Sequence, residues 1–217
     1  MDLGIIEESS SRWASLILMV PKADGTFRLC TDFRKANAVT VPDPFPILCW
    51  KDLIDHIGPA KFLTKLDMTR GYWQVPLDDA SVPFSAFYTP FGHFQWRYMP
   101  FGLRNAPAMF SRLVSKLLLG LETFCAAYLD DIIICSNSWE EHLRHLRMVF
   151  DRILGACLTL IPSKCRFSVA DVDYLGHHVG HGCVQPQAAK VEIVRSFATS
   201  DKPETTTVIS RTNWLLP

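Results

Sequence analysis

Two adjacent aspartates, Asp130 and Asp131, interrupt an otherwise apolar stretch and restrict the folds open to this chain. The runs on either side, 124–129 and 132–135, have the length and composition of core strands. Two unpaired charges inside such a core would be costly, so the pair is expected in a bend between the strands. A hairpin turn whose aspartates face water is the simplest interpretation of an isolated pair. However, the connection lacks the glycine that a two-residue turn prefers.

A third carboxylate, Asp67, ends another apolar strand, predicted at 61–67. The period of two along a strand puts Leu63, Lys65 and Asp67 on one face. Three carboxylates at strand ends can converge on hard divalent cations such as Mg²⁺, which take oxygen ligands. Two such ions, about 3.5–4 Å apart, would activate a hydroxyl and stabilise the leaving oxygen of a phosphoryl transfer. The spacing is compatible with that chemistry without requiring it.

The order of the predicted elements favours an α+β fold over a doubly wound one, because hairpins and helices are interleaved. An Asp-Gly turn joins strands 15–20 and 26–31, and three prolines make 41–46 an extended connector. The remaining predicted elements are a helix at 47–57, strands at 84–88 and 94–99, a helix at 106–119, strands at 165–168 and 173–179, and a helix at 186–197.

A capping box of Ser138 and Glu141 predicts the start of a further helix, and Gly155 suits its end. Helical spacing assigns one apolar face to Leu143, Leu146, Val149, Phe150 and Ile153.

Composition narrows the function classes only slightly. Lys plus Arg equals Asp plus Glu at 22 each, so net charge neither supports nor excludes nucleic-acid binding. The seven cysteines form no Cys-x-x-Cys pair, which argues against a zinc site or a disulfide framework. No apolar run approaches the roughly 20 residues of a membrane helix, and the acidic N-terminal region is unlike a secretory leader. We expect an intracellular protein, in the cytoplasm or nucleus, that is neither secreted nor bound to a membrane.

Six ordered motifs resemble those of reverse transcriptases from gypsy-type LTR retrotransposon Pol polyproteins, over about residues 1–197. They are RLCTDFRKAN at 28–37, LDMTRGYWQ at 66–74, MPFGLRNAPAMF at 99–110, YLDD at 128–131, PSKC at 162–165 and YLGH at 174–177. The resemblance implies the fingers and palm of a right-hand polymerase, with the palm a ferredoxin-like antiparallel sheet backed by helices. By that resemblance the fingers are 1–60 and 84–100, and the palm is 61–83 and 101–180. A primer-grip hairpin then lies near 173–184, and 185–217 is a truncated, divergent start of the thumb.

The resemblance also implies roles at the catalytic centre. Asp67 and Asp130 would ligate two Mg²⁺ ions, or Mn²⁺ in their place, with Asp131 beside them. The backbone carbonyl of Met68 would assist, and Lys164 would be the general acid that protonates the leaving pyrophosphate. Without the resemblance, a lone surface lysine such as Lys164 is usually just solvated.

Other positions match the family's contacts with its substrates, which are a primed RNA or DNA template and deoxynucleoside triphosphates. Lys22 and Arg28 would contact the triphosphate. Tyr72 would lie under the sugar and exclude a 2′-hydroxyl, and Phe101 would pack near the base. Taken singly, Lys22 and Arg28 are solvated hairpin charges, and Tyr72 and Phe101 are core aromatics. The primer grip would comprise Leu175, Gly176 and His177.

The match weakens in two places. Pro83 and Phe84 stand where the family commonly has a lysine before its Thr-Ala-Phe strand, and the pattern decays beyond about residue 198. Without a thumb we expect low processivity, since duplex binding rests on phosphate contacts. We also expect no ribonuclease H in this chain. Homodimers, or association with other retroelement domains, are the expected assemblies.

Two other functions stay open at this point. One is an inactive retroelement remnant that folds and binds nucleic acid without polymerising. The other is a metal-dependent nuclease that uses the same aspartates, against which the nucleotide-selecting motifs count.

Overall fold

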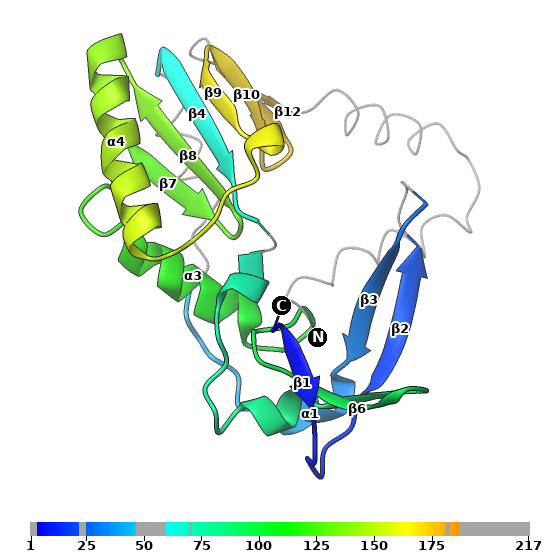
Figure 1. Ribbon diagram of the computed structural model, residues 1–217. Coiled ribbons are helices and arrows are strands. Elements are labelled where there is room, and N and C mark those ends of the chain that lie inside the picture. Colours follow the sequence, from blue (N-terminus) through cyan, green and yellow to red (C-terminus); the bar gives the residue numbers. More distant parts are fainter. Residues whose placement is uncertain (1–3, 22–24, 47–59, 70, 181–182, 187–217) are drawn as a thin grey trace.

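An antiparallel sheet of four strands, in the order β7–β8–β4–β9 and called the central sheet below, lies in the upper left of the computed structural model as Figure 1 shows it. The structure describes residues 4–21, 25–46, 60–69, 71–180 and 183–186. The four strands are Cys125–Tyr128 (β7), Asp131–Ser136 (β8), Phe62–Asp67 (β4) and Arg166–Val169 (β9). Each predicted strand of this sheet is therefore confirmed to within one residue at either end.

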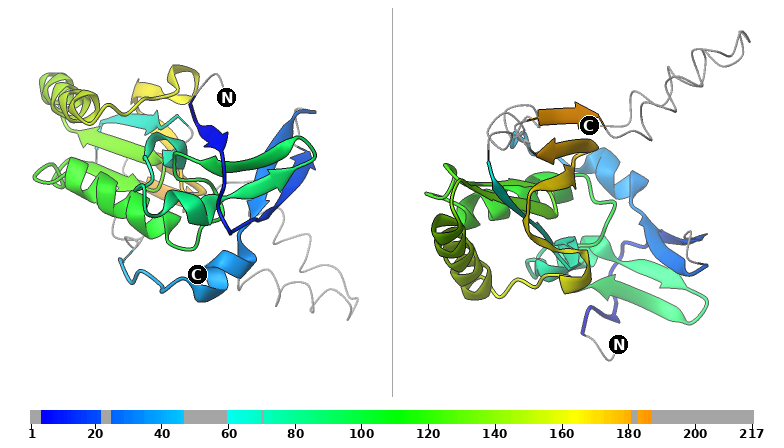
Figure 2. Two further views of the ribbon diagram at one scale, coloured as in Figure 1. Left: turned by 60° about the horizontal axis from the view of Figure 1, so that its bottom comes forward. Right: turned by 90° about the horizontal axis from the view of Figure 1, so that it is seen from above.

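Side chains of β4 and β8 alternate between two cores, as a strand's period of two requires. On one face Leu66, Ile132 and Ile134 are fully buried in a core that also holds Phe110 and Val149 of two helices. These helices, α3 (Ala106–Leu117) and α4 (Trp139–Gly155), cover only this face (Figures 1 and 2).

The opposite face of the central sheet packs on a smaller antiparallel sheet. Leu63 and Ile133 share this second core with Val172, Tyr174 and Val179. The smaller sheet has the order β10–β11–β12, with strands Asp171–Tyr174, His177–Gly180 and Cys183–Pro186. The run 173–179, expected as one strand, is divided because Leu175 (φ 50°) and Gly176 (φ 77°) reverse the chain.

Helix α4 begins where the capping box predicts. The Ser138 hydroxyl accepts the backbone N–H of Glu141 at 3.3 Å, which satisfies one free donor of the first turn. The predicted apolar face is wrong at Leu143, which is half exposed, and the fully buried residue of that turn is His142. Beyond the helix the left-handed conformation is taken by Cys157 (φ 55°) instead of Gly155.

His142 is buried because other elements supply partners for both ring nitrogens. Its Nε2 lies 2.8 Å from the Thr64 hydroxyl of β4, and its Nδ1 lies 2.9 Å from the Ser136 hydroxyl of β8. The Ser136 hydroxyl also lies 2.8 Å from Nδ1 of His145, whose ring stacks on Phe124 at 3.7 Å. This network fastens α4 to the central sheet.

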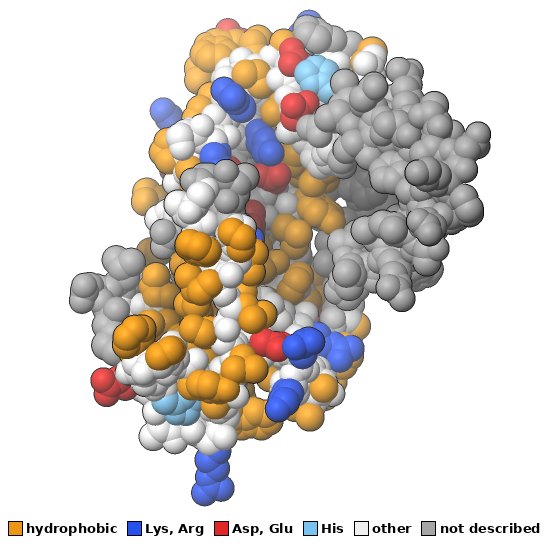
Figure 3. All heavy atoms as spheres, turned by 90° about the vertical axis from the view of Figure 1, so that its right-hand side faces the viewer, with side chains coloured by type: hydrophobic (Ala, Val, Ile, Leu, Met, Phe, Trp, Pro, Cys, Tyr) orange, Lys and Arg blue, Asp and Glu red, His pale blue; other side chains and the backbone are white. Residues whose placement is uncertain are grey.

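A second body of strands carries the N-terminal part of the chain. Phe33, Phe87 and Trp96 form its buried core. Its elements are β1 (Ile6–Glu8), β6 (Gly92–Trp96) and β5 (Phe87–Thr89) in one sheet, the hairpin β2 (Leu16–Pro21) and β3 (Phe27–Asp32), and α1 (Arg34–Val39). The predicted hairpin is confirmed. Both faces of this hairpin carry exposed hydrophobic side chains, among them Leu18 and Phe27, and Figure 3 shows hydrophobic side chains gathered over one side of the molecule.

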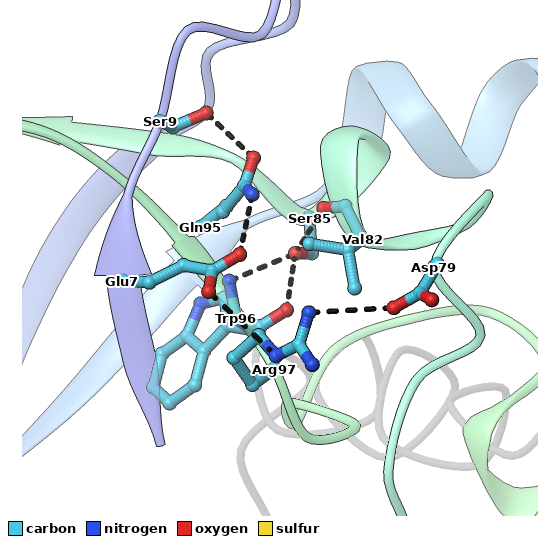
Figure 4. A network of polar contacts seen from close by, with 8 residues as sticks. All are labelled: Glu7, Ser9, Asp79, Val82, Ser85, Gln95, Trp96 and Arg97. Atoms are coloured by element: carbon cyan, nitrogen blue, oxygen red, sulfur yellow. Dashed lines mark hydrogen bonds and ion pairs between the residues drawn. The ribbon is translucent and has the colours of Figure 1, made fainter. Parts of the chain in front are cut away.

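The predicted strand 84–88 is wrong in its first half. Residues Val82–Ser85 form a 3₁₀ helix, η2, and β5 starts only at Phe87. Pro83 cannot donate to a strand ladder. The Ser85 hydroxyl instead donates to the Val82 carbonyl at 2.6 Å and accepts the Trp96 N–H at 2.9 Å, as Figure 4 shows.

Strand β6 ends at Trp96, three residues before the predicted end at 99. The chain beyond it pairs with a different segment, because the Arg97 carbonyl accepts the Leu77 N–H and the Met99 N–H donates to Val75. Arg97 also reaches Glu7 at 3.7 Å and Asp79 at 3.3 Å, which ties β1 and the η2 region to β6 (Figure 4).

Three expectations fall outside the described residues. These are the hairpin turn that holds Lys22, the helix at 47–57, and the helix at 186–197 apart from Pro186, which ends β12. Within the described part of the chain, no helix combines the length and the apolar character needed to cross a bilayer.

Candidate active site

The bend between β7 and β8 is a two-residue hairpin. Tyr128 and Asp131 are its last paired residues, so Leu129 and Asp130 form the loop. Leu129 has a φ of 50°, a conformation that usually requires glycine at this place in a hairpin. A leucine held there costs on the order of 1 kcal/mol, and such strain gathers at functional sites. The turn presents Asp130 at its tip and Asp131 at the start of β8.

The end of β4 meets this bend. Asp67 lies directly opposite Asp131 in the β4–β8 register, and the Met68 N–H donates to the Asp130 carbonyl at 3.0 Å. Three carboxylates that are far apart in the sequence thus lie together at one sheet edge. The predicted meeting of the strand ends is present, and the catalytic role of these residues stays a prediction.

Asp130 is a partly buried loop residue. Its Oδ1 is buried and has no hydrogen-bond partner among the described residues. Burial raises the pKa of this carboxyl, and the charges of Asp131 and Asp67 raise it further, while Lys164 acts in the opposite direction. An anion in this environment favours a cationic ligand.

Gly71 lies against the Asp130 carboxylate. A Cβ built on Gly71 would overlap Oδ1 and stand 2.7 Å from Cγ, so no side chain fits there. Gly71 begins the 3₁₀ helix η1 (Gly71–Gln74), which follows Asp67 after a short turn. The glycine thereby lets η1 approach the aspartates closely.

Two lysines form ion pairs with the other two carboxylates, Asp131 and Asp67. Nζ of Lys65 lies 3.1 Å from Oδ2 of Asp131, and Nζ of Lys164 lies 3.8 Å from Oδ1 of Asp67. The Lys164 position follows from the backbone, since the Ile161 N–H donates to the Asp67 carbonyl at 2.9 Å. The 3₁₀ helix η3 (Pro162–Lys164) then carries the lysine toward the sheet edge.

The donor set fits a hard divalent cation. Carboxylate oxygens are the ligands Mg²⁺ prefers, and one or two protein carboxylates suffice when substrate phosphates supply the rest. The buried, unpaired Oδ1 of Asp130 fits that requirement. The side chains are not preassembled, however: the described residues contain no group of three or more His, Cys, Asp or Glu already arranged around one point. Asp131 and Asp67 are instead each paired with a lysine.

Tyr72 and Phe101 lie side by side next to the aspartates. Their ring centroids are 5.0 Å apart, and Tyr72 also packs edge-on against Phe110 at 5.4 Å. Burial, with smaller contributions from Asp130 and Tyr128, raises the pKa of Tyr72 to about 12. Phe101 is 40% exposed, so part of its side chain is accessible to a ligand.

Gln74 bridges two segments near the aspartates, a structural role that the sequence analysis did not predict. Its side-chain amide donates to the Thr69 carbonyl at 2.7 Å and accepts from the Thr159 N–H at 2.5 Å. These bonds join η1 to the segment that leads to Lys164. Gln74 is the last residue of the motif at 66–74, but its partner Thr159 lies 85 positions away in the sequence.

The predicted phosphate contacts are not brought to the aspartates within the described structure. Arg28 is exposed on β3 opposite Val20, and it makes no ion pair with a described residue. Lys22 lies outside the described residues.

The predicted primer-grip residues form the turn of the β10–β11 hairpin. Tyr174 pairs with His177, and Leu175 and Gly176 are the two loop residues. Tyr174 is fully buried, and its hydroxyl has no hydrogen-bond partner among the described residues. Burial raises the pKa of this phenol, and the Asp131 charge adds to the rise. The hairpin is thus close to the aspartates.

The structure has a central antiparallel sheet with helices on one face and three carboxylates at the ends of two of its strands, an arrangement compatible with the palm of a right-hand polymerase. The reverse transcriptase (RNA-dependent DNA polymerase) family model matches residues 20–179, and the chain belongs to that family. The resemblance stated from its motifs is confirmed.

Relatives and solved structures agree with this assignment. The chain is 38% identical to the retrovirus-related Pol polyprotein from transposon 297 of Drosophila melanogaster, over 93% of this chain and 20% of that protein. It is 30% identical to the enzymatic polyprotein of cauliflower mosaic virus (strain Strasbourg), over 91% of this chain and 30% of that protein. The foamy viral protease–reverse transcriptase in complex with double-stranded DNA matches with a TM-score of 0.84 at 23% identity, over 93% of this chain and 35% of that one. The expected fold is thereby confirmed, and the chain spans about a fifth of the transposon relative.

Proposed function

We propose that this chain is the part of a reverse transcriptase that adds deoxynucleotides to a primer on an RNA or DNA template. The observation that carries the proposal is the meeting of Asp67, Asp130 and Asp131 at one sheet edge. Within the proposal, residues 61–83 and 101–180 are the palm, and 1–60 and 84–100 are the fingers. The two bodies of strands support this division.

Asp67 and Asp130 would hold the metal ions, with help from the carbonyl of Met68. In an extended strand the N–H and C=O of one residue point to the same side. Because the Met68 N–H points to the Asp130 carbonyl, its own carbonyl faces the same bend. Two Mg²⁺ ions, or Mn²⁺, would lower the pKa of the primer hydroxyl and neutralise charge on the leaving oxygen.

Lys164 would donate the proton that the leaving pyrophosphate takes up. The Lys164 side chain is 62% exposed and its ammonium lies 3.8 Å from Asp67, so it would stand beside the reaction centre and remain accessible. A positioned donor of this kind contributes typically 10²–10⁴-fold to rate, roughly. Arg28 and Lys22 would bind the triphosphate when the nucleotide brings the β2–β3 hairpin and the palm into one site.

Tyr72 and Phe101 would form the floor under the nucleotide sugar and base. The Tyr72 ring is fixed by Phe110 behind it and by Phe101 beside it. A ring that cannot retreat would clash with a 2′-hydroxyl, which supports selection of deoxynucleotides.

The primed template would lie over the ends of β4 and β8 that carry the aspartates, beside the β10–β11 hairpin. Solved foamy viral relatives are complexes with double-stranded DNA and with an RNA/DNA hybrid, and we propose the same class of partner here. Leu175, Gly176 and His177 would contact the primer end. The six described cysteines are free thiols, which supports a reducing, intracellular compartment.

The test is primer extension on a primed RNA and a primed DNA template, with deoxynucleotides and Mg²⁺ or Mn²⁺. We expect extension by the wild type, none by Asp130→Asn, and wild-type activity from Asp151→Asn, which removes an exposed carboxylate of α4. Binding of the primed template without extension by the wild type would overturn the proposal in favour of a non-polymerising remnant. Cleavage of the template would overturn it in favour of a nuclease.

A further inference from the structure

Lys65 forms the tightest ion pair at the sheet edge. The side chains of Lys65 and Asp131 are 21% and 25% exposed, and their charged atoms lie 3.1 Å apart. The pair follows from the strand register. Lys65 shares a face with Asp67, two residues away, and Asp131 lies opposite Asp67 on β8. Lys65 and Asp131 are therefore diagonal neighbours on the face away from the helices.

The three carboxylates differ in how close a positively charged side chain lies to each of them. Asp131 has a close, largely buried ammonium. Among the described residues, Asp67 pairs only with the more distant and exposed Lys164, at 3.8 Å, and Oδ1 of Asp130 has no hydrogen-bond partner. A carboxylate that is already neutralised gains least from a metal ion, and an unpaired buried one gains most. The arrangement therefore ranks Asp130 first and Asp131 last as a ligand.

We propose that Lys65 is a positioning residue that withholds Asp131 from the metal ions and sets the affinity of the site for divalent cations. The proposal rests on the proposed function, and it leaves Asp67 and Asp130 as the two carboxylate ligands. The Lys65 ammonium acts on the site in two ways. It holds the Asp131 oxygen away from the ion, and its positive charge repels a divalent cation nearby.

The space around Lys65 shows that packing alone does not hold it there. Lys65 lines a pocket of about 470 Å³ between the central sheet and the β10–β11 hairpin, together with Lys164, Arg166 and Asp173. The acids of this pocket, Asp171 and Asp173, are both within ion-pair distance of His178. A methionine at position 65 would have room in this pocket, and no other described cation lies within ion-pair distance of Asp131.

The test is Mn²⁺ binding by the protein without nucleic acid, followed by electron paramagnetic resonance of the free ion. We expect Lys65→Met to bind Mn²⁺ roughly tenfold more tightly, from the loss of a unit charge a few ångströms from a divalent ion. Lys65→Arg should bind Mn²⁺ with the wild-type affinity, since arginine keeps the positive charge. Lys61→Met is the matched control, because Lys61 is exposed on the same face just before β4 begins. It should leave the affinity unchanged.

A second measurement follows the metal dependence of primer extension. The Mg²⁺ concentration that gives half-maximal rate should fall in Lys65→Met in parallel with the Mn²⁺ dissociation constant. If Lys65→Met, shown to be folded by its thermal unfolding, binds Mn²⁺ as the wild type does or more weakly, the proposal is wrong and the pair is only structural. Lys65→Gln gives the same comparison should the methionine variant not fold.

Failure of this proposal can be told apart from failure of the proposed function. Asp130→Asn should abolish both Mn²⁺ binding and extension if the function is right. A result in which Asp130→Asn has those effects while Lys65→Met changes nothing rejects only the role of Lys65. A result in which Asp130→Asn leaves Mn²⁺ binding intact rejects the metal site itself.

Discussion

The α-carbon of Gly71 lies against the carboxylate of Asp130, and no side chain can stand between them. This contact joins two motifs that are about 60 residues apart in the chain. The position of the Asp130 carboxylate therefore depends on the backbone conformation at the start of η1.

Replacing Gly71 with alanine should therefore displace Asp130. Overpacking of this kind costs about 1–3 kcal/mol of stability, and misplacement of a reacting group by about 1 Å can lower a rate roughly 100-fold. Primer extension and urea unfolding measure the two effects. Gly155→Ala is the control, because nothing lies within 4 Å of a Cβ there and its φ is not positive. Equal activity of the two variants would show that the site tolerates the displacement.

Tyr72→Ala should admit ribonucleotides. The variant removes the ring that Phe101 and Phe110 hold in place, and so removes the clash with a 2′-hydroxyl. The ratio of kcat/KM for a deoxynucleotide to that for the matching ribonucleotide should fall at least tenfold. Tyr72→Phe keeps the ring and should keep the discrimination. An unchanged ratio in the alanine variant would remove Tyr72 from its proposed role.

Asp130→Asn should stabilise the fold while it abolishes activity. The folded-state pKa of Asp130 is raised, so this group stabilises the fold below its unfolded pKa and loses that contribution as pH rises through the folded pKa. Near pH 7 the buried charge is a cost that asparagine removes. Each kcal/mol gained would raise Tm by roughly 2–4 °C for a chain of this size. Asp151→Asn should leave Tm unchanged, and a fall in Tm for Asp130→Asn would contradict the assignment of a burial cost to the charged Asp130 carboxylate.

Acid should loosen helix α4 through His142. Burial lowers the pKa of this imidazole, and His145 lowers it further. A depressed pKa in the folded state means that neutral His142 is favoured by folding. Its contribution is present above the unfolded value of about 6.5 and is lost as pH falls below it, by at most about 1.4 kcal/mol per pH unit.

Urea unfolding between pH 7.5 and pH 5 measures this loss. His142→Gln, which retains hydrogen-bonding groups for Thr64 and Ser136 but cannot titrate, should flatten the dependence. The same slope in both proteins would assign the acid sensitivity to other groups.

The central sheet and the aspartates could be predicted from the sequence because their signals are local. Apolar runs of strand length end at Asp67 and Asp130, and the motifs around them are ordered. The 3₁₀ helix at Val82–Ser85 could not be predicted in the same way, since residues 84–88 are apolar enough for a strand. Its cause is a serine hydroxyl that bonds to Val82 and to Trp96, 11 positions away.

Contacts between distant elements account for what the sequence analysis missed at the site. Strand periodicity placed Lys65 on the face of Asp67, but its pairing with Asp131 depends on the register of β4 against β8. Gly71 is special only because Asp130 packs on it. Likewise His142 is buried only because Thr64 and Ser136 meet its ring, so helical spacing chose the apolar Leu143 in its place.

The alternation of β4 between two cores has a consequence for the evolution of such elements. Leu66 points to the helices and Asp67 to the opposite face, so adding or deleting one codon before this strand end would exchange their places. An insertion would put the leucine in the place proposed for a metal ligand, and either change would force the aspartate among buried apolar groups. Single-residue length changes in β4 should be lethal to the enzyme, even where point substitutions of its exposed residues are tolerated.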